Sequence, residues 1–297
     1  MKLQFSDSTV SKGERLKVLK SPATPSQLAY TSYVENAVTP NARIVLIHGF
    51  TQNGDSFATI ASELALRQPY EVICVDLPGH GGSSNLQTGL DETADLLLSF
   101  GVDSIWAAYS LGARHLLAMC LKYSKFSWNV ILSGVNPGIE DEGERLRRYQ
   151  ADIAIANELN SIEGDEGHFR EFLTRWMSMA LFQPRGPINE DLQNRLKNSP
   201  KALASSLVHS SIGMQDNLWP RVQELRGHLT LITGGADAKY LAIADRLASL
   251  LQKREQIAVR SEIIDSLGHA AIFDNPQTLV NAVIASSKIR IQKNSGS

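Results

Sequence analysis

Short, continuous apolar runs recur along the chain, and each is followed by a loop of small or polar residues and then by a segment with helical spacing. Apolar runs of this length are typical of strands that are buried on both faces of a parallel sheet. Strands are predicted at 44–47, 72–75, 105–108, 129–132, 228–233 and 257–264, and helices at 56–67, 90–100, 111–122, 241–252 and 276–291. This alternation predicts an α/β fold with a mostly parallel, doubly wound sheet.

Two stretches depart from the alternation. Residues 16–19 and 28–34 flank a turn that contains two prolines, so we expect an antiparallel hairpin at the edge of the sheet. Residues 136–216 contain no clear strand, and helical segments are expected there at 142–159, 168–181, 189–198 and 202–210. We therefore predict an α/β core formed by residues 1–135 and 217–297, with a helical cap at 136–216 inserted over the strand ends.

Composition narrows the class of protein. The 297 residues are 43% hydrophobic and 20% charged, which is ordinary for a globular chain, and a net charge of −2 gives no basic field for nucleic acid. No apolar run approaches the roughly 20 residues that span a bilayer, and the first residues lack the apolar core of a secretory signal. Cys74 and Cys120 lie in apolar segments, which favours buried thiols over a disulfide. A cytoplasmic protein without nucleic-acid or membrane partners is expected, and its oligomeric state stays open.

Ser110 lies where a predicted strand gives way at once to a predicted helix. Ala108 and Gly112 stand two positions to either side, which matches the nucleophile-elbow pattern G-x-S-x-G with alanine for the first glycine. Such a turn holds the serine hydroxyl above the sheet at a helix N-terminus, where negative charge is stabilised. An ordinary serine in a strand–helix turn has the same local pattern, so the rest of the chain must decide.

Asp237 and His269 follow later predicted strands, in the order Ser…Asp…His that α/β-hydrolases use. A serine needs an imidazole to take its proton, and the imidazole needs a carboxylate to fix its tautomer. Taken singly, Asp237 is a turn aspartate and His269 a packed loop histidine; their joint placement after the right strands predicts a catalytic triad. The backbone N–H groups of Phe50 and Leu111 are the expected oxyanion hole.

The chain resembles the α/β-hydrolase superfamily over nearly its whole length. More narrowly, it is similar to the 2-succinyl-6-hydroxy-2,4-cyclohexadiene-1-carboxylate (SHCHC) synthases of menaquinone and phylloquinone biosynthesis. The motifs Tyr-Ser-Leu-Gly-x-Arg at 109–114 and Asp-x-Lys-Tyr at 237–240 are the more particular ones. The segments shared more widely, or matched in addition, are 46–50, 76–81, 136–139 and 268–270.

This resemblance implies a lyase that removes pyruvate from 2-succinyl-5-enolpyruvyl-6-hydroxy-3-cyclohexene-1-carboxylate, with the triad as base and with no metal or organic cofactor. It also implies a small polycarboxylate substrate, which guanidinium groups bind bidentately. Arg114 lies one helical turn beyond Ser110, although an exposed helix arginine fits that spacing equally well. The substrate-binding residues implied in this way are Tyr109, Arg114, Arg148, Trp176, Arg195 and Lys239.

Some positions depart from the family pattern, and other functions stay open. Ala108 and Ala113 replace glycines, and His209 stands where many relatives have arginine. The same triad would serve a hydrolase of an ester, a thioester or a carbon–carbon bond, with Ser110 as a covalent nucleophile. A non-enzymatic ligand receptor is a further alternative, against which an intact triad argues.

Overall fold

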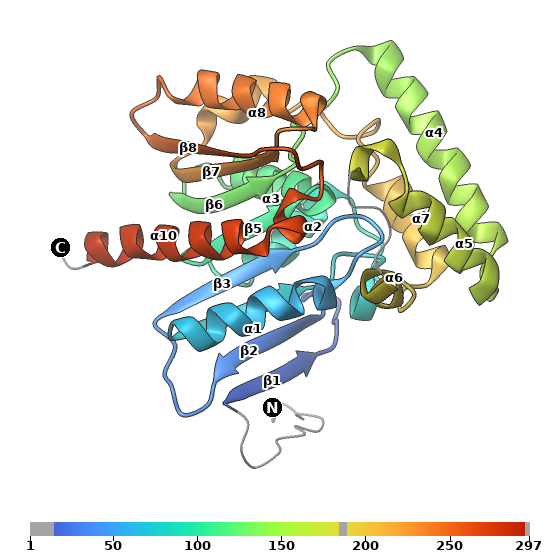
Figure 1. Cartoon of the computed structure of the whole chain (residues 1–297). Coiled ribbons are helices and arrows are strands. Elements are labelled where there is room, and N and C mark those ends of the chain that lie inside the picture. The colour runs from blue at the N-terminus through green and yellow to red at the C-terminus, as the bar shows by residue number, and fades with distance from the viewer. Residues whose placement is uncertain (1–14, 184–188, 295–297) are drawn as a thin grey trace.

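An eight-stranded sheet forms the centre of the computed structural model, which describes residues 15–183 and 189–294 (Figure 1). The strand order is β1-β2-β4-β3-β5-β6-β7-β8. The strands are β1 (Leu16–Ser21), β2 (Tyr30–Glu35), β3 (Ala42–Ile47), β4 (Tyr70–Val75), β5 (Ile105–Tyr109), β6 (Trp128–Ser133), β7 (Gly227–Gly234) and β8 (Ile257–Ile264). From β4 to β8 all neighbours pair in parallel. The predicted fold class is therefore confirmed.

The first two strands form the antiparallel hairpin that the sequence predicts at the sheet edge. β1 pairs with β2 from Leu16, opposite Glu35, to Ser21, opposite Tyr30, and β2 also pairs antiparallel with β4. The edge strand β1 is the more exposed of the two, whereas β2 buries Thr31, Ser32 and Tyr33. This hairpin extends the parallel part of the sheet by two strands.

Helices cover both faces of the sheet (Figure 1). α1 (Ala58–Arg67) and α10 (Pro276–Asn294) lie on one face, and α2 (Leu90–Leu98), α3 (Leu111–Lys122) and α8 (Ala238–Leu251) lie on the other. The central strand β3 shows why both faces need cover. Its Ile44 and Leu46 pack into the apolar cluster beneath α1 and α10, while Val45 and Ile47 pack into the cluster beneath α3. Alternate side chains of a strand point to opposite faces, so a continuous apolar run is buried on both.

Among the described residues, four α-helices are inserted between β6 and β7, in the stretch where the sequence predicts a cap. They are α4 (Glu142–Ser161), α5 (Glu166–Met177), α6 (Asn189–Arg195) and α7 (Pro200–His209), and they gather beside the sheet, beyond the strand ends (Figure 1). Leu159, Phe172 and Leu203 belong to an apolar cluster that these helices share, separate from the two clusters of the sheet. Asp141, Asp165 and Ser199 cap α4, α5 and α7 with their side chains.

Several boundaries differ from the sequence prediction. α5 ends at Met177 rather than at 181, because the chain becomes extended at Met179 before a short 3-10 turn, η3 (Ala180–Phe182). α9 (Ala271–Asp274) follows His269 and was not predicted. The other 3-10 turns are η1 (Gly54–Phe57), η2 (Gly81–Ser83) and η4 (Trp219–Glu224).

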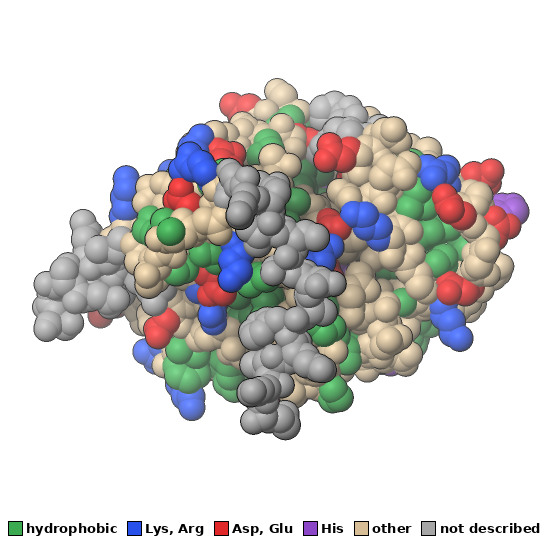
Figure 2. Space-filling view, turned by 90° about the horizontal axis from the view of Figure 1, so that it is seen from below, with side chains coloured by type: hydrophobic (Ala, Val, Ile, Leu, Met, Phe, Trp, Pro, Cys, Tyr) green, Lys and Arg blue, Asp and Glu red, His purple; other side chains and the backbone are tan. Residues whose placement is uncertain are grey.

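Both cysteines are buried and free, as predicted. Among the described residues, no helix is long and apolar enough to cross a membrane. The N-terminal residues on which the signal-peptide prediction rests lie outside the described part. Over the face shown in Figure 2, Lys and Arg side chains are interspersed with Asp and Glu.

Candidate active site

Ser110 occupies a sharp turn between β5 and α3. Its φ of 51° and ψ of −109° lie in a region that residues with a side chain rarely adopt, so the backbone is strained there. The turn is held on both sides, because Ser110 N–H donates to Ser133 O of β6 at 2.8 Å and Arg114 N–H donates to Ser110 O at 3.2 Å. A strained serine at the start of a helix is the arrangement that the elbow pattern predicts.

The first turn of α3 packs tightly on the loop that follows β3. Gly112 N–H donates to His48 O at 3.0 Å, and a Cβ atom at Gly112 would stand only 2.6 Å from the same oxygen. Only glycine therefore allows this approach, which brings the N-terminus of α3 against the loop that contains Phe50. Among the described residues, neither Phe50 N–H nor Leu111 N–H donates to a protein acceptor. Both groups are available as the donors of an oxyanion hole.

Ser110, His269 and Asp237 form a hydrogen-bonded chain. Ser110 Oγ lies 2.9 Å from His269 Nε2, and His269 Nδ1 lies 2.9 Å from Asp237 Oδ2. Asp237 also caps α8, because its Oδ1 accepts from Tyr240 N–H at 3.2 Å, and this second bond fixes the carboxylate. Since a carboxylate only accepts, Nδ1 carries the proton of a neutral imidazole and Nε2 is free to accept from the serine hydroxyl. This is the tautomer that lets His269 act as a base toward Ser110.

Aromatic side chains surround the imidazole. The ring of Tyr240 lies 4.2 Å from that of His269 between centroids, Tyr109 lies at 5.3 Å and Phe182 at 6.1 Å. Burial raises the pKa of Tyr109 and of Tyr240, so both phenols stay protonated. Phe182 comes from the inserted helical segment, and His269 N–H donates to Leu181 O of that same segment at 3.2 Å. The insertion therefore closes over the triad and leaves His269 only 3% exposed.

Arg114 is held by neutral groups alone. Its guanidinium donates to Gln215 Oε1 at 2.9 Å and to Ser210 O at 2.8 Å, and it forms no ion pair with any described carboxylate. Gln215 is fixed in turn, because its Nε2 donates to Pro137 O at 2.9 Å. Burial lowers the pKa of Arg114 to about 10, which still leaves it charged at neutral pH. A partly buried cation without a paired anion is costly, so this site is suited to a negatively charged ligand.

Arg148 is a second guanidinium group that lies near Arg114 and Tyr240. Its Nε is 2.9 Å from Oδ1 of Asp152, a buried carboxylate that also accepts from Ser211 Oγ at 2.7 Å. The charges of Arg148 and Arg114 both oppose the burial effect on the pKa of Tyr240. Two guanidinium groups therefore lie near the tyrosine that packs on His269, with Asp152 paired to Arg148 and Asp237 hydrogen-bonded to His269.

Two other predicted residues, Trp176 and Arg195, contact Phe50 from the inserted helical segment. Trp176 packs on Phe50 and Phe182, with centroid distances of 5.2 and 6.3 Å, and its buried Nε1 has no hydrogen-bond partner. Arg195 is 6% exposed, pairs with Asp191 at 3.1 Å and donates to Phe50 O at 3.4 Å.

In the motif 237–240, Tyr240 and not Lys239 packs against the triad. Lys239 is exposed and forms no hydrogen bond or ion pair with the triad, whereas its neighbour Tyr240 packs on His269. His209, at the position where relatives have arginine, is exposed, and its Nδ1 lies 2.8 Å from Ser205 O of its own helix.

The sequence alone did not predict a role for the side chains of three residues of the site, Tyr240, Gln215 and Asp152. Tyr240 stands in the quoted motif, so a signal for it was present, but Gln215 and Asp152 are ordinary polar residues in helix-rich sequence. A cleft of about 440 Å³ is lined in part by Tyr109, Phe182 and Ala270, but neither Arg114 nor a member of the triad lines it. Within the described ranges, no group of three or more His, Cys, Asp or Glu residues is arranged to hold a metal ion.

Comparison with known proteins places this site in a family. The model of the "Alpha/beta hydrolase family" matches residues 44–283, which include all three members of the hydrogen-bonded chain. The chain belongs to the alpha/beta hydrolase family.

Two relatives in the alpha/beta hydrolase family have the name of the same synthase. A Bacillus subtilis protein called "putative 2-succinyl-6-hydroxy-2,4-cyclohexadiene-1-carboxylate synthase" is 26% identical over 80% of this chain and 88% of its own length. The synthase of the same name from an Enterobacter species is 26% identical over 84% and 93%. The solved structure of MenH from S. aureus has a TM-score of 0.73 and 27% identity, and the match covers 87% of this chain and 97% of that one. The resemblance to SHCHC synthases is therefore confirmed.

Proposed function

We propose that the chain is a lyase that eliminates pyruvate from 2-succinyl-5-enolpyruvyl-6-hydroxy-3-cyclohexene-1-carboxylate and forms SHCHC, a step of menaquinone or phylloquinone biosynthesis. One observation carries this proposal beyond the names of the relatives. Arg114, one turn from Ser110, is a partly buried cation whose guanidinium is hydrogen-bonded only to neutral acceptors. A pocket for a neutral ester has no use for such a charge, whereas a substrate with several carboxylates compensates it.

The chemistry follows from the difference between substrate and product. The ring carbon that bears the succinyl group loses a proton, the ring double bonds rearrange, and the carbon–oxygen bond to the enolpyruvyl group breaks. Ser110, deprotonated by His269, takes the ring proton, and Asp237 stabilises the imidazolium that forms. Because the proton lies next to the succinyl ketone, negative charge develops on that carbonyl oxygen, where the N–H groups of Phe50 and Leu111 would bind it. The enolpyruvate that leaves takes up a proton and becomes pyruvate.

The two guanidinium groups are assigned to the substrate carboxylates. Arg114 is the principal anchor, because its guanidinium forms no ion pair with a described carboxylate, and Arg148 is a second one, although it is paired with Asp152. Tyr109, Trp176 and Arg195 would complete the wall of the site. Lys239 belongs to this set only if a substrate carboxylate reaches the exposed end of α8.

A serine hydrolase is the alternative function. The hydrogen bond of 2.9 Å between Ser110 Oγ and His269 Nε2 suits a covalent nucleophile as well as a base, and the two free N–H groups suit a tetrahedral intermediate. The two functions differ in what the substrate must carry, since an ester hydrolase does not need Arg114.

Pyruvate release tests the proposal. Freshly made substrate is mixed with the purified protein, and pyruvate is followed with a coupled dehydrogenase for the wild type and for Ser110→Ala. We expect rapid release of one pyruvate per substrate by the wild type and a loss of at least about 10³-fold in the variant. A wild type that hydrolyses a nitrophenyl ester but releases no pyruvate would identify a hydrolase instead.

A further inference from the structure

The loop that contains Phe50 includes a strained residue with no part in the chemistry. Gly49 and Gln52 close a four-residue turn, because Gln52 N–H donates to Gly49 O at 3.2 Å. The third position of this turn is Thr51, with a φ of +67°. A positive φ there is the mark of a type II turn, in which glycine or asparagine is normally required. A β-branched residue in this region is a true outlier, and it persists only where its surroundings impose it.

Two side chains from the inserted helical segment bind this turn. Asn198 Nδ2 donates to Thr51 O at 2.8 Å and to Arg195 O at 3.0 Å, while its Oδ1 accepts from Gly81 N–H at 2.8 Å. Arg195 donates to Phe50 O and to Thr51 Oγ1. Thr51 is fully buried and Asn198 is 6% exposed, so these bonds are not replaced by solvent. Every hydrogen-bonding atom of the Asn198 side chain is used to join three separate segments.

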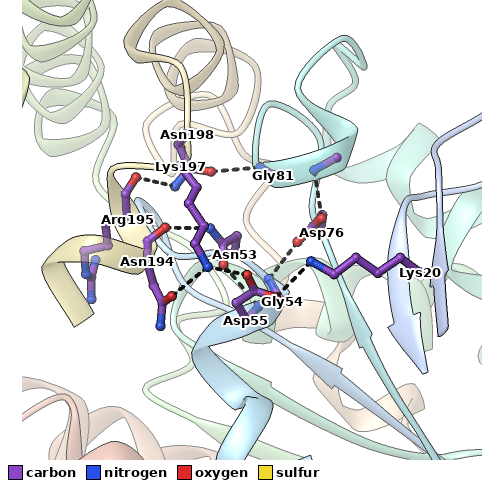
Figure 3. Close-up of polar contacts among 11 residues, drawn as sticks. Lys20, Asn53, Gly54, Asp55, Asp76, Gly81, Asn194, Arg195, Lys197 and Asn198 are labelled. Carbon is purple, nitrogen blue, oxygen red and sulfur yellow. Dashed lines mark hydrogen bonds and ion pairs between the residues drawn. The ribbon is translucent and has the colours of Figure 1, made fainter. Parts of the chain in front are cut away.

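A second set of contacts holds the same loops from the side of the sheet. Asp76 accepts from Gly54 N–H at 2.7 Å and from Gly82 N–H at 2.8 Å, which links the loop after β3 to the loop after β4 (Figure 3). Lys197 pairs with Asp55 at 2.6 Å, but this ion pair is exposed, and Lys197 forms no hydrogen bond with Phe50 or Thr51. The loop is therefore anchored by the core at Gly54 and by the inserted segment at Thr51.

We propose that Asn198 is a positioning residue for the oxyanion hole. Without its bond to Thr51 O, the threonine would favour a type I turn, in which the peptide between Phe50 and Thr51 is rotated and its carbonyl no longer faces Arg195. The rotated peptide carries Phe50 O and Thr51 N–H, whereas Phe50 N–H belongs to the preceding peptide. The change in ψ at Phe50 and in φ at Thr51 that accompanies the rotation moves Phe50 within the loop, and its N–H is displaced from the point where charge develops. Because Asn198 belongs to the inserted helical segment, the hole is complete only while residues 195–198 are in place on the core. This inference rests on the proposed function only in that Ser110 is catalytic, because a lyase and a serine hydrolase would both use this oxyanion hole.

Two variants test the role of Asn198, each compared with Lys197→Ala. Asn198→Ala removes all the bonds, whereas Asn198→Asp keeps the volume and the acceptor for Gly81 N–H but cannot donate to Thr51 O when ionised. For each protein, kcat and KM for pyruvate release are measured, together with the rate at which a fluorophosphonate labels Ser110, since phosphonylation of Ser110 also uses the oxyanion hole. Thermal melting identifies the folded variants, and the aspartate variant serves if the alanine variant does not fold.

We expect both Asn198 variants to lose roughly 10- to 100-fold in kcat and in labelling rate, with KM changed less than about threefold. Lys197→Ala should stay within about twofold of the wild type in all three quantities. Folded Asn198 variants with unchanged kcat and labelling would overturn the inference, and so would an equal loss in Lys197→Ala, which would indicate general docking of the inserted segment. If the wild type releases no pyruvate, the proposed lyase fails, but the labelling rates still decide the role of Asn198.

Discussion

Gly134 lies directly against the ring of His269. A Cβ atom at this glycine would stand 2.5 Å from His269 Cε1 and 3.1 Å from both ring nitrogens. The ring of His269 also packs on the ring of Tyr240, with 4.2 Å between the centroids, and its two nitrogens are hydrogen-bonded to Asp237 and Ser110. The imidazole therefore has no free space in which to rotate, and its position depends on the absence of a side chain at the end of β6.

Gly134→Ala should therefore displace the catalytic imidazole. The added methyl group forces His269 to move by a fraction of an ångström to about one ångström, and a displacement of that size costs about 10²-fold in kcat. The variant also strains a backbone with a φ of +63°, so some loss of stability accompanies it. Gly101→Ala is the matched control, because Gly101 has a φ of +99° but its Cβ would meet only Ser104 Oγ at 3.7 Å. Steady-state kinetics should show the loss in Gly134→Ala alone; equal losses in both would mean that strain, not displacement, is responsible.

Gln215→Glu should change the preference of the site for charged substrates. A glutamate in place of Gln215 would pair with Arg114, which now donates to the neutral Gln215 Oε1 at 2.9 Å, and would compete with a substrate carboxylate. Loss of a charge-assisted contact of about 1.5–3 kcal/mol corresponds to a rise in KM of roughly 10- to 100-fold for the polycarboxylate.

Hydrolysis of a neutral nitrophenyl ester gives the internal comparison for Gln215→Glu, because it should stay within about twofold. Gln223→Glu, the same substitution at an exposed position in η4, should affect neither reaction. An unchanged KM for the polycarboxylate in Gln215→Glu would show that Arg114 does not bind the substrate.

The buried side chain of His115 should make the free energy of unfolding depend on pH. This histidine is 1% exposed in α3 beside Arg114, and burial lowers its pKa from an ordinary value of 6.5 to about 3. Between these values the unfolded chain binds a proton that the folded chain does not, so the free energy of unfolding falls as the pH falls. From pH 7 to pH 5 this one group contributes a loss of about 2 kcal/mol.

In a His115→Gln variant the new side chain is neutral at all pH values. It can keep a contact with Ser210, whose Oγ lies 3.2 Å from His115 Nε2 in the wild type. Urea unfolding of His115→Gln at pH 7 and pH 5 should therefore show a smaller loss than the wild type, by about 2 kcal/mol. His168→Gln is the control, since His168 is exposed and Asp165 raises rather than lowers its pKa. An identical pH dependence in wild type and His115→Gln would contradict the assignment of a buried, neutral histidine.

The local signals of the sequence account for most of the fold and for the order of the triad. Continuous apolar runs such as 44–47 mark strands that need cover on both faces, and small residues around Ser110 permit the strained turn. Once the strands are placed, the parallel arrangement brings Ser110, Asp237 and His269 to one edge of the sheet without further information.

The contacts that tune the site depend on tertiary approach and leave no such mark. Lys239 and Tyr240 are neighbours on a helix, about 100° apart around its axis, and the motif alone does not say which one faces His269. Gln215 and Asn198 gain their roles from the carbonyl groups that they meet, Pro137 O and Thr51 O, which lie far away in the sequence. The strain at Thr51 is likewise imposed by the inserted segment and is not visible in the composition of the loop.

The central claim, that Ser110 acts as a base toward a polycarboxylate, is tested most directly by the mass of the intact enzyme during turnover. Samples quenched while substrate is still present are divided, one part for pyruvate and the other for mass spectrometry of the protein. We expect many equivalents of pyruvate and an enzyme whose mass stays that of the unmodified chain at every time point. Accumulation of a covalent adduct on Ser110, lost in Ser110→Ala and hydrolysed at the rate of turnover, would contradict the claim and identify a hydrolase.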